Sequence, residues 1–242
     1  MKIHVAGENA LIVYLGEKPG EVVNESTTAA IHHLCSQLKP YLGNELVDLI
    51  PSYASVLVVF DPLQTDHLQV RKWIRYAGER HFHNVESDQR NVVRLPVYYG
   101  GADLPRIAEQ SSISIDDAIQ LHTQNHYQVY AIGFAPGFAY LGEVDEKIAT
   151  PRLSTPRKKV PKGAVAIADK QTAVYPNESP GGWNILGFCP VNMFDADKQP
   201  TMPVASGDHV EFYSIDKATF LEMGGTLPHE EFLLELNQEA AV

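Results

Sequence analysis

The sequence predicts an α+β protein in which a ferredoxin-like domain precedes a β-barrel domain. Over roughly the first hundred residues, strand-like and amphipathic runs follow the order β-α-β-β-α-β, the split βαβ arrangement of ferredoxin-like domains. From residue 129 onward, short β-rich runs alternate with Gly/Pro turns, as in closed or nearly closed barrels. A polar, weakly patterned stretch over residues 81–89 separates the two parts. We therefore expect domains at residues 1–88 and 89–242.

The elements of the first domain follow from hydrophobic spacing. An apolar run over residues 10–15 is bounded by polar residues and Gly16, which predicts a short strand. Residues 21–38 carry apolar side chains at helical spacing, and Pro40 and Gly43 end this helix. Two strands rich in Val, Leu and Ile, an amphipathic helix and a final strand follow at residues 46–50, 55–60, 66–80 and 91–99.

The second domain begins with a helical pair at residues 104–110 and 115–123. Ser114 is a suitable N-cap for the second helix, with Asp116 and Asp117 well placed in its first turn. An acidic stretch over residues 222–238 has partly helical spacing and predicts a peripheral tail. The predicted barrel strands are residues 129–132, 165–168, 173–175, 189–194 and 209–213.

Composition limits the classes of partner. The chain has 242 residues, with 19 Lys and Arg against 30 Asp and Glu, for a formal charge of -11. A field of that sign repels phosphate backbones and anionic membranes, so we expect no nucleic-acid or membrane partner. The dense basic cluster Arg152, Arg157, Lys158, Lys159 and Lys162 is too compact for a duplex and better suits a small anion or an acidic protein.

The cysteines and the N-terminal residues favour the cytoplasm. Cys35 and Cys189 lie far apart without CxxC spacing, which argues against a disulfide scaffold and fits a reducing compartment. Residues 1–15 lack the uninterrupted apolar core of a signal peptide. No run of residues reaches the length needed to span a bilayer.

Several catalytic signatures are absent from the sequence. It contains no GxGxxG, no GxxxxGK[ST], no GxSxG and no HExxH. His32-His33 and the pair His81 and His83 lack other metal-ligating side chains at suitable spacing, so we interpret them as solvated. We therefore expect this chain to hold neither a metal site nor an ATP site of its own.

Residues 130–190 form the most informative segment. Gly and Pro occur there at a density that a plain helix or central strand does not tolerate, with aromatic and Arg residues between them. Such a segment is typical of a shaped binding surface. Gly181-Gly182 before Trp183 suggests that the backbone approaches another group closely, because glycines otherwise lower stability.

Each candidate side chain in this segment has two interpretations. Arg152 and Arg157 either bind a carboxylate or phosphate through the guanidinium fork or pair with internal acids, and the two alternatives are equally supported. Tyr140, Tyr175 and Trp183 are either core aromatics or the apolar wall of a shallow site.

His122 near the end of the second predicted helix is open to the same question. It either caps the negative end of the helix, which we slightly favour, or lies at the pocket edge as a proton shuttle or substrate donor.

The ordered motifs resemble one known family. The chain is similar to the allophanate hydrolase subunit 1 family, also described as the C and D subdomains of a carboxyltransferase, whose members include the B subunit of 5-oxoprolinase and a sporulation kinase inhibitor. The matching motifs are LPVYYGG at 95–101, LH at 121–122, GFAPGFAYLG at 133–142, PR and VP within 156–161, QT and YP within 171–176, and SPGGW at 179–183.

The resemblance implies a cyclophilin-like barrel and an ATP-dependent amide hydrolase that acts as a complex. On this hypothesis the chain joins two partners: one with the A and B subdomains, which is the C subunit of 5-oxoprolinase, and a third protein, the A subunit. Together they open 5-oxoproline to L-glutamate, with ATP used by the assembled complex and the chain inactive alone. Two alternatives stay open: a component of a urea- or allophanate-type amidohydrolase or carboxylase, and a regulatory protein that inhibits a sensor histidine kinase.

The resemblance also implies which residues form the site. Arg157, His122 and Tyr175 are the expected catalytic residues, with Arg157 stabilising an anionic intermediate. The expected substrate-binding residues are Gly133, Phe134, Pro136, Gly137, Tyr140, Arg152, Pro156, Gln171, Thr172, Pro180, Gly181, Gly182 and Trp183.

The chain departs from the family pattern at three places. Residues 101–104 are shorter than usual, and Ala164 replaces a usual Ser. Phe188 and Cys189 replace a usual Arg and Thr, which weakens the expectation about substrate but not about fold.

Overall fold

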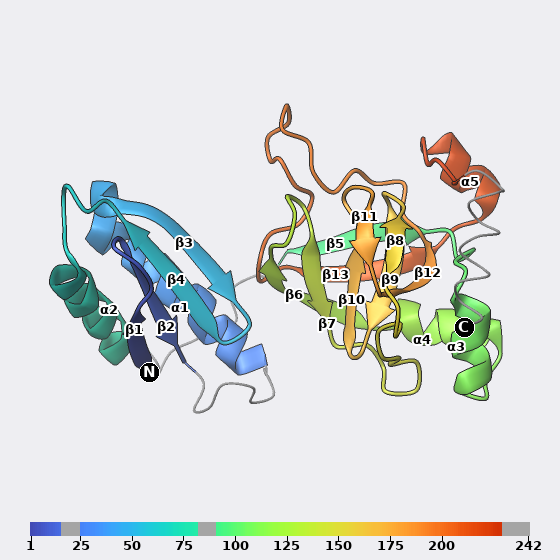
Figure 1. Cartoon of the computed structure of the whole chain (residues 1–242), viewed down its shortest axis with the longest axis horizontal. Coiled ribbons are helices and arrows are strands. Elements are labelled where there is room, and N and C mark those ends of the chain that lie inside the picture. Colours follow the sequence, from blue (N-terminus) through green and yellow to red (C-terminus); the bar gives the residue numbers. More distant parts are fainter. Residues whose placement is uncertain (16–24, 82–90, 229–242) are drawn as a thin grey trace. The chain divides into compact units, whose positions relative to one another are not determined.

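The computed structural model describes residues 1–15, 25–81 and 91–228 (Figure 1). The chain divides into two compact units, Met1–Arg90 and Asn91–Val242, which we call unit 1 and unit 2. No helix in the described ranges is long and apolar enough to cross a bilayer.

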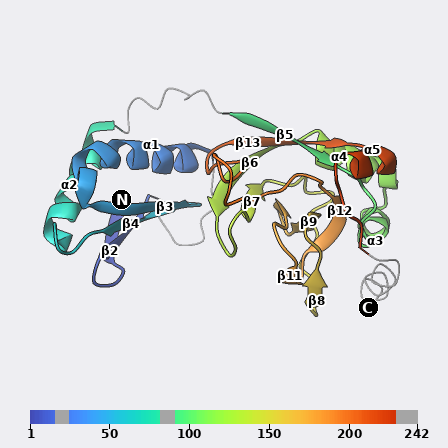
Figure 2. The same ribbon diagram turned by 90° about the horizontal axis from the view of Figure 1, so that it is seen from above.

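Unit 1 contains a four-stranded antiparallel sheet in the order β1-β2-β4-β3 within its described residues. Its elements are β1 Lys2–Val5, β2 Ala10–Tyr14, α1 Glu25–Leu42, the 3-10 helix η1 Gly43–Glu45, β3 Leu46–Ser52, β4 Ser55–Phe60 and α2 His67–His81. Both helices pack on one face of this sheet, and Figure 2 shows α1 running along it. Leu11, Val58 and Phe60 are fully buried there against Ile31 and Ile74.

The order of elements in unit 1 differs from the prediction at both ends. β4 lies between β2 and β3, so β2, α1 and β3 form the expected split βαβ unit. The predicted last strand of this domain is instead β5, Val92–Val97, which pairs in the sheet of unit 2. Its expected place beside β2 is taken by β1, a strand too short and mixed in character to be predicted from its pattern. The ferredoxin-like assignment of unit 1 stays a prediction.

Unit 2 is a nearly closed barrel, as the sequence predicts. Its described residues form a seven-stranded sheet in the order β12-β9-β10-β7-β6-β13-β5 and a two-stranded sheet of β11 and β8. The backbones of Tyr98 and Phe188, which follow β5 and end β12, exchange two hydrogen bonds of 2.9 Å that join the sheet edges. The remaining elements are α3 Leu104–Gln110, α4 Ile115–Thr123, β6 His126–Ile132, β7 Ala139–Gly142, β8 Arg157–Val160, β9 Ala164–Ala168, β10 Gln171–Val174, β11 Ser179–Gly181, β12 Asn184–Phe188, β13 His209–Ser214 and α5 Lys217–Glu222.

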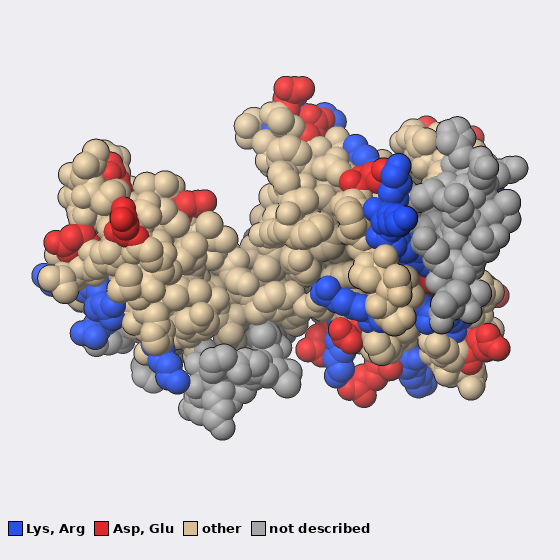
Figure 3. All heavy atoms as spheres, in the orientation of Figure 1, with Lys and Arg blue, Asp and Glu red and all other residues tan. Residues whose placement is uncertain are grey.

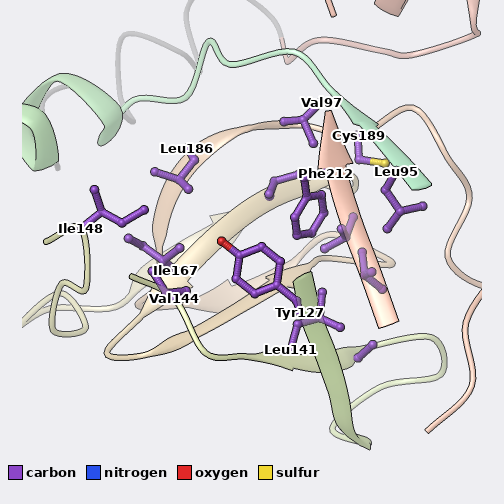
Figure 4. Packing of buried hydrophobic residues seen from close by; sticks show 14 of the residues in the cluster. Leu95, Val97, Tyr127, Leu141, Val144, Ile148, Ile167, Leu186, Cys189 and Phe212 are labelled. Atoms are coloured by element: carbon purple, nitrogen blue, oxygen red, sulfur yellow. The ribbon is translucent and has the colours of Figure 1, made fainter. Parts of the chain in front are cut away.

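The barrel sheet separates two apolar clusters because successive side chains of a strand point to opposite faces. Val165 and Ile167 of β9 face the barrel interior, whereas Ala164, Ala166 and Ala168 face the other side. Figure 4 shows Tyr127 and Phe212 within the interior cluster, beside Leu141 and Leu186. This alternation places the predicted site residues of the strands on opposite sides of the sheet.

The helical pair of unit 2 confirms the prediction. Ser114 caps α4, because its Oγ accepts the amide of Asp117 at 3.0 Å and the Asp117 carboxylate accepts the amide of Ser114. Three other predictions have different outcomes. The strand expected at 189–194 is wrong, because the strand ends at Phe188 and Pro190 has no amide hydrogen to continue a ladder. The boundary at 81–89 and the tail at 222–238 lie mostly outside the described residues.

Candidate functional site

An aromatic cluster lies on the outer side of β10 and β12. Phe138 is its centre, with ring centroids 4.9 Å from Tyr140, 5.2 Å from Tyr175, 5.4 Å from Phe134 and 5.8 Å from Trp183. We call these five residues the aromatic platform. Most of these contacts are steep edge-to-face or tilted pairs, the arrangement that the aromatic quadrupole favours. The platform combines a rigid buried base with the partly exposed Tyr140 and the exposed Phe134.

Small side chains make room for the platform. Ala166, Ala168 and Ala173 point to the outer face of β9 and β10 and belong to the same apolar cluster as Phe138 and Trp183. Since each alanine ends at Cβ, the large rings pack close to the sheet and keep a fixed orientation.

Arg152 brings a positive charge to the platform. Its guanidinium lies 5.6 Å from the Trp183 ring centroid, and the residue is exposed. Lys and Arg side chains gather around the part of unit 2 that holds β8 and β11 (Figure 3). An aromatic wall beside a solvent-facing guanidinium is suited to a small, flat molecule that carries a carboxylate.

A buried ion pair holds the segment beneath the platform. Arg157 is 1% exposed, and its Nη2 donates to Oδ1 of Asp103 at 2.9 Å while Nη1 donates to the Trp183 carbonyl oxygen at 3.3 Å. The other carboxylate oxygen of Asp103 accepts the Ile185 amide at 2.7 Å. The internal-pair interpretation of Arg157 is therefore the one that the structure shows.

Asn184 fixes the loop that carries Arg152. Its amide nitrogen donates to the carbonyl oxygens of Pro151 at 2.9 Å and Ile167 at 3.1 Å, and its oxygen accepts from Arg106. The Leu153 amide also donates to the Gly182 carbonyl at 2.7 Å. The backbone is thus held on both sides of Arg152, which limits where this side chain can reach.

Tyr175 is a buried hydroxyl donor within the platform. Burial raises the pKa of Tyr175 to about 12, although the positive charges of Arg152 and Arg157 oppose that shift. The phenol therefore stays protonated at neutral pH. A Cβ on Gly181 would overlap the Tyr175 hydroxyl, so this glycine meets the close approach expected of it, whereas a Cβ on Gly182 would make ordinary contacts from 3.5 Å.

The turn that presents Phe134 is strained. Phe134 has φ of +73°, a region that L-residues with bulky side chains rarely adopt, and its side chain is 70% exposed. The Gly133 amide donates to the Phe138 carbonyl, and the Phe138 amide to the Ala135 carbonyl, both at 3.0 Å. Gly137 at φ +84° packs against the Met193 carbonyl, which leaves no room for a side chain. The turn thus has two energetic costs, the positive φ of Phe134 and the exposure of its apolar ring to solvent. Strained residues of this kind cluster at binding sites.

His122 lies away from the platform, in the barrel interior. It is fully buried and stacks on Phe212 with centroids 4.8 Å apart. Its Nδ1 lies 2.7 Å from the Tyr99 hydroxyl and its Nε2 lies 3.0 Å from Oγ1 of Thr172, which itself donates to the Ala166 carbonyl. The hydroxyl hydrogen of Thr172 is used there, so Nε2 carries the imidazole proton and Nδ1 accepts from Tyr99.

That environment makes His122 a neutral core residue. Burial lowers its pKa from about 6.5 to about 3. It neither caps α4 nor lies at a pocket edge in this structure, and its part in catalysis stays a prediction. Thr172 shares its position because it faces inward on β10, whereas its neighbours on either side face outward.

The other predicted site residues lie on the platform side or at its border. Gln171 is on the outer face of β10, in line with Tyr175, and is half-buried. Pro136, Pro156 and Pro180 are exposed on the surrounding turns, and the Pro156 Cα lies 3.7 Å from a Cβ built on Gly182.

Sequence reasoning missed Phe138, Asp103 and Asn184 as parts of the site. Phe138 lies within a family motif, and Asp103 and Asn184 lie one or two residues beyond one, but a buried polar network between distant segments has no periodic signal. Asp103 and Asn184 are among the few fully buried polar side chains described, and that property appears only in three dimensions.

The described residues suggest no metal centre. No group of three His, Cys, Asp or Glu side chains in the described ranges could hold an ion. A separate cavity of about 670 Å³ in unit 2 includes none of the predicted site residues. Its walls come from Lys159, Lys162, Glu178, Cys189, Phe220 and neighbouring residues.

Comparison with known proteins gives consistent relatives. A Bacillus subtilis (strain 168) protein named as the B subunit of 5-oxoprolinase is 33% identical over 236 residues, covering 90% of this chain and 95% of that protein. A protein of the same name from Escherichia coli O157:H7 is 31% identical and covers 87% and 94%.

Solved structures show the same fold. TTHA0988 superposes with a TM-score of 0.75 and 31% identity, covering 86% of this chain and 40% of that one, so this chain spans about two fifths of its length. The Kluyveromyces lactis urea carboxylase is 16% identical, with a TM-score of 0.69, and the match covers 99% of this chain and 25% of the carboxylase chain. At this identity the likeness shows a shared fold and no more. The model of one family matches residues 1–204, and the chain belongs to that family, the carboxyltransferase domain, subdomain C and D.

Proposed function

We propose that this chain is the B subunit of an ATP-dependent 5-oxoprolinase that opens 5-oxoproline to L-glutamate in the cytoplasm. The observation that carries the proposal is the match over 95% of the length of the B. subtilis protein that bears this name. Because the chain aligns with nearly the whole of that relative, the likeness is not confined to a shared barrel.

The chemistry of the platform supports a substrate of this kind. 5-Oxoproline is a small five-membered lactam with one carboxylate. Arg152 offers a planar fork for the carboxylate, and the partly exposed Tyr140, which packs against the buried Trp183, offers apolar surface for the ring. Tyr175 is 2% exposed, so its protonated hydroxyl lies beneath the surface of the platform, and its proposed role as a donor for negative charge on the amide requires that the substrate reach below that surface. Arg157 contributes as a positioning residue that holds the Trp183 backbone through its bond to the carbonyl.

The reaction requires partners. An amide is a poor electrophile, so opening the lactam with water is coupled to cleavage of ATP to ADP and phosphate. The sequence contains no GxGxxG or GxxxxGK[ST] motif, and we assign ATP use to the assembled complex. The partners are the C subunit of 5-oxoprolinase, which is of the carboxyltransferase A–B type, and a third protein, the A subunit. The chain alone is inactive.

One observation favours a second function, that of a regulatory protein that binds and inhibits a sensor histidine kinase. Phe134 is exposed on a strained turn, and aromatic side chains are enriched in protein interfaces. Partner binding that depends on Phe134 without any lactam turnover would select this function.

Glutamate release from 5-oxoproline and ATP tests the enzymatic proposal. It should occur with the three subunits mixed and not with this chain alone. Arg152→Lys should raise KM for 5-oxoproline about tenfold or more, since Lys keeps the charge but loses the fork. The matched control is Arg94→Lys, which alters another exposed Arg, lying 5.2 Å from the Tyr213 ring, and should leave KM unchanged. Equal KM values for the two variants would remove Arg152 from substrate binding, and no turnover by a complex shown to be assembled would refute the proposed function.

A further inference from the structure

The face of the unit 1 sheet that points away from α1 and α2 is apolar. The cross-strand register places Ile12 of β2, Leu57 of β4 and Ile50 of β3 in one row. Tyr14 and Val59 flank this row on the same face. These residues are partly exposed, with Ile50 at 43%, whereas the residues that alternate with them in β2 and β4 are fully buried under the helices.

The two central strands have the sequence of strands covered on both faces. β2 reads ALIVY and β4 reads SVLVVF, with little alternation of apolar and polar residues. Antiparallel sheets with one wet face normally alternate, whereas strands buried on both sides are nearly continuous in apolar residues. Within the described part of unit 1, both helices lie on one side of the sheet. The amino acids thus match a sheet whose second face is covered.

The two edges of this face carry complementary groups. His4 of β1 lies opposite Ile12 and on the same face, in edge-to-face contact with Tyr14. Asp48 of β3 lies opposite Val59 at the other edge, again on the same face. Both side chains are exposed, so each is accessible to a partner.

We propose that a second copy of this chain covers this face, as a twofold symmetric pair of sheets. In a symmetric dimer the same patch meets itself, so it must be self-complementary. Rotation about an axis parallel to the strands places the β1 edge of one copy over the β3 edge of the other and keeps each residue's position along the strands. His4 of each copy then lies over Ile50 of the other, two residues from Asp48 on the same strand, while Ile12 and Leu57 pack centrally. A different protein could supply its own complementary groups, so a patch that binds such a protein would not need both an imidazole and a carboxylate.

Sedimentation velocity of the full chain over a range of concentrations tests the first part of this proposal. We expect a dimer, and a loss of at least tenfold in its association constant for Leu57→Glu, because two charges would enter the apolar centre. The matched control is Leu63→Glu, the same change at a residue that is 94% exposed in the turn after β4, and it should dimerise as the parent does. Circular dichroism verifies that both variants are folded.

Charge exchange at the edges tests the symmetry and does not depend on a core substitution. His4→Asp and Asp48→Lys should each weaken self-association. The first brings a carboxylate to the edge that carries Asp48, and the second leaves His4 without an acidic group on the edge that it meets. An equimolar mixture of the two variants should regain dimerisation, since every contact in the mixed dimer joins opposite groups. A monomeric parent chain at all concentrations, or a mixture no more associated than its components, would overturn the proposal. A monomer in which Leu57→Glu abolishes binding to a different protein of the complex would show instead that this face serves that protein.

Discussion

Asp103 shows how one residue supports the platform without touching its surface. Its carboxylate pairs with Arg157 on β8 and accepts the backbone amide of Ile185 on β12. Both partners flank the segment that carries Trp183. Removing one member of a buried ion pair is costly because the remaining charge stays in a medium of low polarity.

Replacing Asp103 with Asn should therefore destabilise unit 2 by about 3–5 kcal/mol, measured by urea unfolding. The nearly isosteric amide keeps the volume, but it removes the charge and replaces one of the two accepting oxygens with an NH2 donor. Asp116→Asn, in the exposed first turn of α4, is the control and should cost no more than about 1 kcal/mol. The double variant Asp103→Leu, Arg157→Met should recover much of the loss. An Asp103→Asn variant as stable as its control would mean that the ion pair does not hold this region.

His122 predicts a definite dependence of stability on pH. Its folded pKa of about 3 lies below the unfolded value of about 6.5, so between these limits the unfolded chain binds a proton that the folded chain does not. The free energy of unfolding therefore falls as pH decreases through this window, by at most about 1.4 kcal/mol per pH unit from this group.

Comparison with His122→Gln isolates that contribution. Glutamine retains a donor and an acceptor for Thr172 and Tyr99 but does not titrate. Unfolding by urea at several pH values between about 4 and 6.5 should show a smaller slope for the variant, because the carboxylates contribute equally to both proteins. Identical slopes would show that folded His122 takes up its proton as readily as the unfolded chain.

At the scale of elements, strand alternation decides which motif residues can meet a ligand. Gln171 and Tyr175 lie on the outer face in the line of β10, and Thr172 between them points into the barrel. Adjacent residues of one sequence motif are thus assigned to opposite sides of the sheet. A motif read as a single binding unit combines residues of the site with residues of the core.

The glycine pair at the end of β11 offers a matched test. Gly181→Ala should destabilise the protein by about 1–3 kcal/mol, because its Cβ would overlap the hydroxyl of the buried Tyr175. Gly182→Ala meets only ordinary contacts and should be tolerated far better. The free energies of unfolding check this order, and near-ultraviolet circular dichroism reports whether the aromatic platform is disturbed. Equal effects of the two substitutions would contradict the close approach at Gly181.

At the scale of the whole molecule, the apolar side chains form separate clusters within unit 1 and unit 2. We propose that these units are independent folding domains. Leu11→Ala, at a fully buried position in unit 1, should then destabilise that unit by about 2–5 kcal/mol. The midpoint temperature of one thermal transition should fall, and that of unit 2 should stay in place. Differential scanning calorimetry resolves the two. A single transition that shifts as a whole would show that the units unfold together.

The sequence by itself determined the α+β class, the barrel, the helical pair with its Ser114 cap and the Gly/Pro-rich segment that carries most of the aromatic platform. These features depend on local periodicity, turn residues and caps, which are written in adjacent positions. Only the tertiary structure decided that β5 pairs in unit 2, that Arg157 is neutralised by Asp103, and that His122 belongs to the core. Each of these depends on partners distant in the chain, Arg157 and Asp103 being 54 residues apart. Burial and charge pairing arise from the meeting of such segments, and no local pattern records which segments meet.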